Sequence, residues 1–220
     1  MTVTYEATGS GGNITLLSDV TTIDTSWSHT AGGGEMNVVV LFGSFYIAAG
    51  YNTWTITATY GGTPMTLLSS LANSTNAAWG SFAFYLMDPP TGAQTVIASA
   101  SGALGKPRLE GNSVSYNNAF TPSATAASSS SSTSSITVAS GAGSMVCATQ
   151  QCWGSASFSS IDGTQRGSTL YNGVARFAVH DTAGDSSVTL TGTMSASAGW
   201  NSIGVNIPAQ RSQDFFAFFT

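Results

Sequence analysis

The clearest pattern in the chain is an alternation of threonine with apolar residues between Thr53 and Tyr60. Every second residue from Trp54 onward is apolar, and the residues between them are threonines. Side chains of a β-strand alternate between its two faces, so this pattern predicts a strand with one buried face. The pair Gly61-Gly62 follows, and the strand pattern resumes over residues 63–68. Two residues that tolerate positive φ between two strands predict a hairpin.

Two other segments are apolar at successive positions, which is typical of strands covered on both faces. They span Met36–Phe42 and Phe82–Met87. A glycine cluster precedes the first, and the Pro-containing turn Asp88–Gly92 ends the second. Further short strand-like runs occur at Thr95–Ala98, Ser113–Tyr116, Ile136–Val138, Met145–Thr149, Ala156–Phe158, Ala175–His180, Ser187–Leu190 and Trp200–Ile207.

Many short strands without a helical apolar period predict an all-β fold. We expect a two-sheet antiparallel β-sandwich, jelly-roll-like, with minimal helix. The length of 220 residues fits one large domain over residues 1–209, followed by a tail over residues 210–220. The almost pure serine stretch Ser128–Ser135 is either an exposed connection or a polar edge leading into the strand at Ile136.

The sequence ends with a phenylalanine-rich segment. A large apolar side chain left in water forgoes roughly 1.5–3 kcal/mol of burial free energy, so this segment must dock. It docks either on the protein's own sandwich or into a neighbouring subunit. We interpret it as an assembly tail whose partner-binding residues are Phe215, Phe216, Phe218 and Phe219.

Charged residues make up 7% of the chain, against about 25% in an ordinary protein. Few like charges keep copies apart, so we expect a homo-oligomer. The net charge of −5 and the five Lys and Arg residues argue against nucleic-acid binding. Apolar runs are far shorter than the ~20 residues of a membrane span, which predicts no membrane insertion. The N-terminal sequence has no signal-peptide pattern, which predicts synthesis in a host cytoplasm.

Residues that carry catalytic or metal chemistry are scarce. The histidines are His29 and His180, and we predict that His180 and Asp181 are turn residues. Cys147 and Cys152 lack the spacing of a metal site, and we predict two buried free thiols. A glycosidase needs two carboxylates that face each other across a cleft, and the scattered acidic residues of this chain do not identify such a pair. We therefore expect no enzymatic activity, no cofactor and no metal.

The tryptophans divide into core candidates and surface candidates. Trp54 and Trp200 lie within apolar strand patterns, which predicts burial. Trp153 follows two glutamines, and Tyr51 lies in a predicted loop. Trp153 and Tyr51 are the candidates for contact with a glycan.

Several of these segments together resemble a known module. They are SWSHT at 26–30, VVV at 38–40, TYGGTPMTL at 59–67, LMDPPTG at 86–92 and GWNSIGVNI at 199–207. The series resembles a β-sandwich module of bacteriophage virion proteins and some bacterial surface proteins, over residues 27–207. The resemblance implies a jelly-roll-like structural module with no catalytic site to transfer.

On this resemblance we expect a non-enzymatic phage virion structural protein, specifically a minor tail protein that contacts other virion structural proteins. One alternative is a capsid decoration protein that stabilises the head. A further alternative is a receptor-binding adhesion domain that recognises a host-surface glycan.

Overall fold

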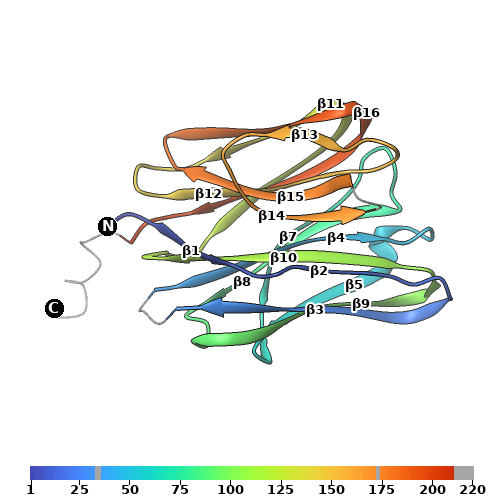
Figure 1. The fold of residues 1–220 in the computed structure, drawn as a ribbon, viewed down its shortest axis with the longest axis horizontal. Helices are drawn as coiled ribbons and strands as arrows, with labels where there is room; N and C mark the ends of the chain where they lie inside the picture. The colour runs from blue at the N-terminus through green and yellow to red at the C-terminus, as the bar shows by residue number, and fades with distance from the viewer. Residues whose placement is uncertain (33–35, 172–173, 211–220) are drawn as a thin grey trace.

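The computed structural model describes residues 1–32, 36–171 and 174–210, and their strands form three stacked antiparallel sheets (Figure 1). We call them the lower, middle and upper sheets, as they lie in Figure 1. The expected all-β antiparallel sandwich is confirmed, with three sheets where two were expected. The described residues contain no α-helix, only the 3-10 turn η1 (Tyr51–Thr53). No helix in this described part has the length and apolar character needed to cross a membrane.

The middle sheet has the order β1-β10-β4-β8-β7, with β2 also paired to β10. Its strands are β1 (Thr4–Thr8), β2 (Gly12–Thr15), β4 (Val38–Tyr46), β7 (Thr66–Ala72), β8 (Trp79–Met87) and β10 (Arg108–Asn117). The lower sheet has the order β3-β9-β5-β6. Its strands are β3 (Val20–Ala31), β5 (Trp54–Tyr60), β6 (Thr63–Pro64) and β9 (Gly92–Gly105).

The upper sheet has the order β11-β16-β12-β15-β14, with β13 also paired to β16. Its strands are β11 (Ser123–Ala139), β12 (Met145–Cys152), β13 (Phe158–Ile161), β14 (Thr164–Tyr171), β15 (Val174–Ala183) and β16 (Ser187–Ile207).

The middle sheet is covered on both faces, which explains the unbroken apolar pattern of β4. Val39 and Leu41 belong to the core shared with the lower sheet. Val38 and Val40 belong to the core shared with the upper sheet. Alternate side chains of one strand therefore fill two separate cores. The prediction that this strand is covered on both faces is confirmed.

The predicted hairpin is confirmed, but its second strand is short. Gly61 and Gly62 have φ values of 56° and 82°, and Tyr60 pairs with Thr63 across the turn. The ladder ends at Pro64, which has no N–H to donate. The chain then leaves the lower sheet and forms β7 of the middle sheet.

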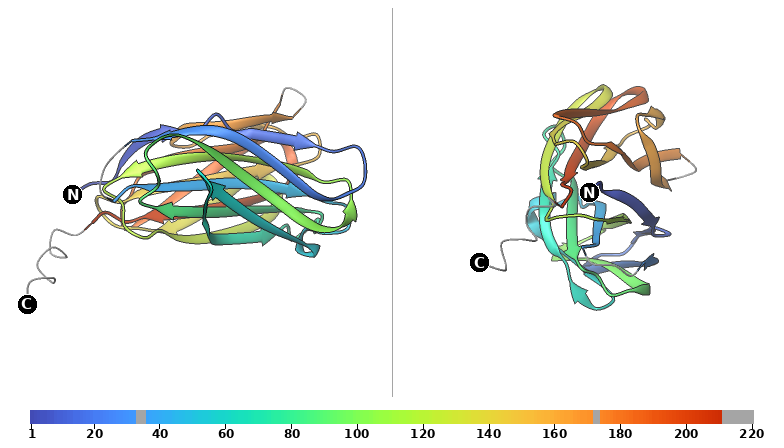
Figure 2. Two further views of the ribbon diagram at one scale, coloured as in Figure 1. Left: turned by 90° about the horizontal axis from the view of Figure 1, so that it is seen from below. Right: turned by 90° about the vertical axis from the view of Figure 1, so that its left-hand side faces the viewer.

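The serine-rich stretch lies inside β11, a strand at the edge of the upper sheet. Of the two interpretations, the polar edge is therefore correct. Strand β11 pairs with β16 from Ser123↔Asn206 to Ala139↔Ser187, with a register shift after Ser131. This long ribbon bends over β12, as Figure 2 shows, and encloses a small additional core. That core contains Ile136, Val138, Val146, Ala148 and Leu190.

Candidate functional site

The two predicted glycan contacts are wrong, because both aromatic side chains are buried. Trp153 is 7% exposed and Tyr51 is 4% exposed. Trp153 stacks on Trp79 with ring centroids 5.8 Å apart and planes 6° apart. The Tyr51 hydroxyl donates to the Ser81 carbonyl at 3.2 Å. Each residue lies near a turn, but contacts with distant strands cover it.

The core assignments of the other aromatics and of the thiols hold. Trp54 and Trp200 are buried, as predicted. Cys147 and Cys152 are both free and buried, which confirms the prediction for the thiols. Burial raises the pKa of Cys152 to about 12. A thiol with this pKa stays protonated and is a poor nucleophile near neutral pH.

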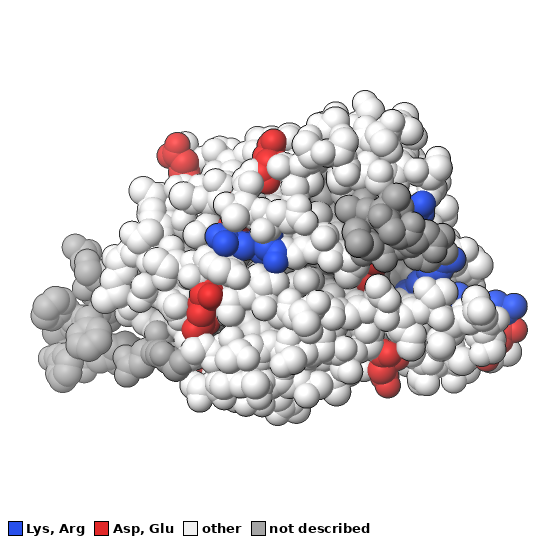
Figure 3. Space-filling model, in the orientation of Figure 1, with Lys and Arg blue, Asp and Glu red and all other residues white. Residues whose placement is uncertain are grey.

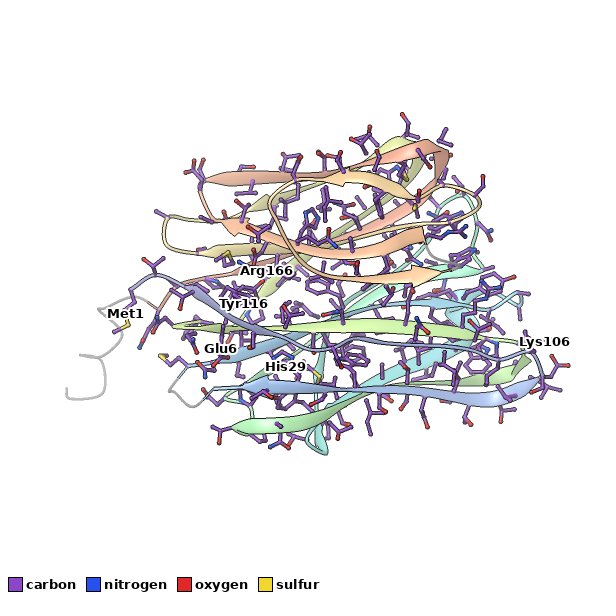
Figure 4. The ribbon with its side chains drawn as sticks, in the orientation of Figure 1. Met1, Glu6, His29, Lys106, Tyr116 and Arg166 are labelled. Atoms are coloured by element: carbon purple, nitrogen blue, oxygen red, sulfur yellow. The ribbon has the colours of Figure 1, made fainter. Side chains whose placement is uncertain are left out.

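The assignment of His180 and Asp181 to a turn is wrong, because both are buried inside β15. Both carboxylate oxygens of Asp181 accept from the Nε of Arg166 at 2.9 Å. The Tyr116 hydroxyl of the middle sheet also donates to this carboxylate, at 2.9 Å. The Arg166 guanidinium lies 3.6 Å from the centroid of the Tyr5 ring. This cluster joins the middle and upper sheets, and Figure 4 labels two of its members.

His29 lies between the middle and lower sheets and connects them (Figure 4). Its Nδ1 is 2.7 Å from the Ser113 hydroxyl, and its Nε2 is 3.1 Å from the Ser115 hydroxyl. Trp27 Nε1 donates to the same Ser113 oxygen at 2.8 Å. Burial lowers the pKa of His29 to about 4, so the ring is neutral at pH 7. The Ser–His pair is enclosed in the core and connects two layers.

A polar region interrupts the core between the middle and upper sheets. The side chains of β4 that face the upper sheet are apolar up to Phe42, and the next two are Ser44 and Tyr46. Strand register extends this change across neighbouring strands as two rows of side chains. One row contains Thr15, Arg108, Tyr46 and Trp79, and the next contains Asn13, Glu110, Ser44 and Ser81.

A cavity of about 470 Å³ lies against these rows. Its volume is in the range of small-molecule sites. Arg108, Glu110 and Trp79 line it from the middle sheet, and Arg176 lines it from β15. Cys152 and Ser44 form buried parts of its wall, whereas Asn13 and Thr15 are solvent-exposed. Two of the five Lys and Arg residues of the chain therefore line one cavity.

Hydrogen bonds and ring contacts hold the lining of this cavity in place. The Thr169 hydroxyl donates to Glu110 at 2.7 Å. Burial raises the pKa of Glu110, and the hydrogen bonds and the nearby arginines only partly offset that effect. The Arg108 guanidinium lies 5.7 Å from the centroid of the Tyr46 ring. That ring contacts Trp79 with centroids 4.6 Å apart. Glu110, Arg108 and Trp79 are thus held in place.

Basic side chains are sparse on the face that Figure 3 shows, and some of them gather near its right-hand end. Figure 4 labels Lys106 at this same end, in the link between β9 and β10. The cavity residue Arg108 follows two positions later at the start of β10. Arg108 and Arg176 therefore lie at the cavity and Lys106 lies at the same end of the molecule, whereas Arg166 lies in the cluster with Asp181.

The outward face of the lower sheet is covered with hydroxyl groups, and we call it the hydroxyl face. Its strands place Thr or Ser at nearly every second position, and Asp24 is the charged residue among the outward positions of β3, β5 and β9. The hydroxyl residues are Thr22, Ser26, Ser28, Thr30, Thr55, Thr57, Thr59, Thr95, Ser99 and Ser101.

The upper sheet has a similar outer ribbon, where the Thr137 and Thr189 hydroxyls lie 2.9 Å apart. The predicted partner-binding residues Phe215, Phe216, Phe218 and Phe219 lie outside the described residues. Among the residues described, no group of three His, Cys, Asp or Glu side chains could hold a metal ion.

Neither a protein-family model nor a curated protein matches this sequence. Solved structures of virus proteins show a remote likeness. A chain of Sulfolobus Turreted Icosahedral Virus is 16% identical with a TM-score of 0.29, over 89% of this chain and 59% of that one. A chain of infectious bursal disease virus, Gt strain, is 10% identical with a TM-score of 0.28, over 97% of this chain and 41% of that one. The chain in the crystal structure of the STIV MCP is 11% identical with a TM-score of 0.23, over 95% of this chain and 100% of that one.

This chain thus spans 59% of the length of the first of these virus chains and 41% of the second. The TM-scores are too low to define a common topology, and no function is transferred from these proteins.

Proposed function

We propose that this protein is a non-enzymatic structural component of a phage virion, specifically a minor tail protein that assembles as a homo-oligomer with other virion proteins. The hydroxyl face carries this proposal. Uncharged β-surfaces can pack closely on a neighbour because few charges must be desolvated and few like charges repel. Short hydroxyl side chains also lose little rotamer entropy when they are buried in a contact.

The positions of the segments that resemble the phage module support this proposal. The SWSHT segment lies in β3, the VVV segment begins β4, and GWNSIGVNI ends β16. The segments thus occur in all three sheets, and TYGGTPMTL forms the hairpin that leads from the lower to the middle sheet. We propose that residues 1–209 act as one structural module.

Immunogold labelling of intact virions tests the proposed location, with an antibody raised against the purified chain. We expect label on the tail. Label spread over the head would contradict the tail assignment and support a capsid decoration protein. Particles without label, beside a positive control for a known virion protein, would contradict a virion role altogether.

We also propose that the phenylalanine-rich tail contacts a neighbouring subunit. The last described residue, Gln210, lies beside Asn118, because the Gln210 N–H donates to the Asn118 carbonyl at 3.3 Å. Phe120 is 47% exposed and Met1 is 74% exposed at this end of the molecule. An apolar segment that starts there can extend this apolar surface across a subunit boundary.

Deleting residues 215–220 should therefore leave the sandwich folded but abolish its incorporation into particles. Circular dichroism and thermal melting of the purified chain report folding, and immunoblotting of purified virions reports incorporation. Normal incorporation of the truncated chain would contradict the proposed contact. A truncated chain that does not fold would instead indicate that the tail docks on its own sandwich.

A further inference from the structure

We propose that the cavity between the middle and upper sheets binds a small sugar that carries a carboxylate, such as a hexuronic acid or a sialic acid. The site consists of Arg108, Arg176, Glu110, Trp79 and Asn13. It differs from the glycan contact that the sequence predicts, because Trp153 and Tyr51 are not among its lining residues. The binding of such a sugar is independent of where in a particle the protein lies.

The two guanidinium groups favour an anionic ligand. Arg108 enters from β10 and Arg176 from β15, so the cavity has cations on walls that belong to two different sheets. A planar guanidinium matches the geometry of a carboxylate and can donate two parallel hydrogen bonds. The lining contains these two cations and a single acidic residue, Glu110.

The single acidic group of the lining does not cancel the two cations. Glu110 accepts a hydrogen bond from Thr169, and burial favours its neutral form. Even a fully ionised Glu110 leaves the lining with more positive than negative charge, because two arginines face it. A protonated Glu110 could also donate a hydrogen bond to a ligand oxygen.

The remaining lining suits a polyhydroxylated ring. Trp79 supplies an apolar aromatic group, and ring contacts with Tyr46 and Trp153 fix the position of its indole. Asn13 and Thr15 add an amide and a hydroxyl on the exposed side, and Ser44 adds a hydroxyl at the buried side. An apolar body with a few fixed polar groups is the usual composition of a small-molecule site. Its aromatic and polar groups distinguish a sugar acid from a simple carboxylate.

Isothermal titration calorimetry of the full chain with glucuronic acid and with sialic acid tests this proposal. We expect binding of at least one acid at ligand concentrations up to about 10 mM. Glucose should bind at least about tenfold more weakly than glucuronic acid, because it offers no charge to the guanidinium groups. Acetate should also bind more weakly than either sugar acid.

The matched variants are Arg108→Gln and Lys106→Gln, since each removes one positive charge and they lie two positions apart. Lys106 is not among the lining residues of the cavity. Arg108→Gln should weaken binding about tenfold or more, whereas Lys106→Gln should change it less than about twofold. Arg176→Gln serves as a second cavity variant if Arg108→Gln fails to fold.

Absence of binding by both acids would overturn the proposal, as would equal affinity of the two Gln variants. Equal binding of acetate and glucuronic acid would overturn the sugar specificity. None of these results would alter an immunogold label on the tail, so failure of this site and failure of the virion role are distinguishable.

Discussion

At the scale of single residues, buried polar side chains connect the layers of this protein. His29 links the lower and middle sheets through Ser113 and Ser115. Asp181 links the middle and upper sheets through Tyr116. Paired in this way, such groups fix how the layers align, because an unpaired partner left in the core costs about 1–3 kcal/mol.

The buried His29 should make the protein less stable in mild acid. Its pKa is lowered from 6.5 to about 4 by burial, so between these pH values the unfolded chain binds a proton that the folded chain does not. Stability should therefore be unaffected by this group above pH 6.5 and fall as the pH drops toward 4. The total loss from His29 is about 3 kcal/mol.

Urea unfolding at several pH values checks this prediction on the natural chain and on His29→Gln. The variant should lose less stability on acidification than the natural chain does. His180, whose pKa is also lowered by burial, and Glu110, whose pKa is raised, contribute equally to both proteins. Parallel pH profiles for the two proteins would show that His29 does not set the acid sensitivity.

The burial of a residue could be predicted from the sequence only where the neighbouring residues form an apolar strand pattern. Trp54 and Trp200 lie within apolar strand patterns, so the sequence predicted their burial. Trp153 and Tyr51 lie beside turns, and their burial depends on Trp79 and Ser81 of a distant strand. The cavity residues Arg108 and Arg176 were missed for the same reason, since only the packing of the upper sheet on the middle sheet brings them together. The one local signal was Ser44, the first polar residue at the alternate positions of β4 after Val38, Val40 and Phe42.

At the scale of strands, periodicity indicates whether a face is covered but not what covers it. The apolar run of β4 predicted a doubly covered strand, and that prediction is confirmed. It did not show that the two covering layers are separate sheets. Strand β14 (Thr164–Tyr171) was not predicted, because its sequence TQRGSTLY lacks apolar alternation.

Arg166 of β14 and Asp181 of β15 form an ion pair, so their contributions to the free energy of unfolding should be strongly coupled. Asp181 is buried, so replacing Arg166 with Met leaves an uncompensated charge in the core. We expect Arg166→Met to destabilise the protein by about 3 kcal/mol. The double variant Arg166→Met/Asp181→Asn should cost clearly less than the sum of the two single variants.

A double-mutant cycle of urea unfolding measures this coupling. Lys106→Met, which removes an exposed cation, is the control and should change the free energy of unfolding by no more than about 0.5 kcal/mol. Additive effects of Arg166→Met and Asp181→Asn would show that the two residues do not interact in solution.

At the scale of the whole molecule, the low charge density should govern how copies associate. Few charged side chains reach the surface, and Asp24 is the single charged residue among the described outward positions of the hydroxyl face. Contacts made by such faces depend on hydrogen bonds and packing, which salt does not screen.

Self-association of the full chain should therefore change little between about 0.05 M and about 0.5 M sodium chloride, although the Debye length falls severalfold over this range. Sedimentation equilibrium at both concentrations measures the association constant. A marked dissociation at high salt would show that ion pairs hold the copies together.

The double burial of the middle sheet also has a consequence for how the chain is made on the ribosome. Strand β4 (Val38–Tyr46) is synthesised long before the strand that last covers it from above, β16, which ends at Ile207. A nine-residue segment that is almost entirely apolar and free of charge is prone to form β-aggregates while it is uncovered. The nascent chain leaves this segment uncovered until β16 has been synthesised, so we expect chaperones that bind extended apolar strands to increase its folding yield.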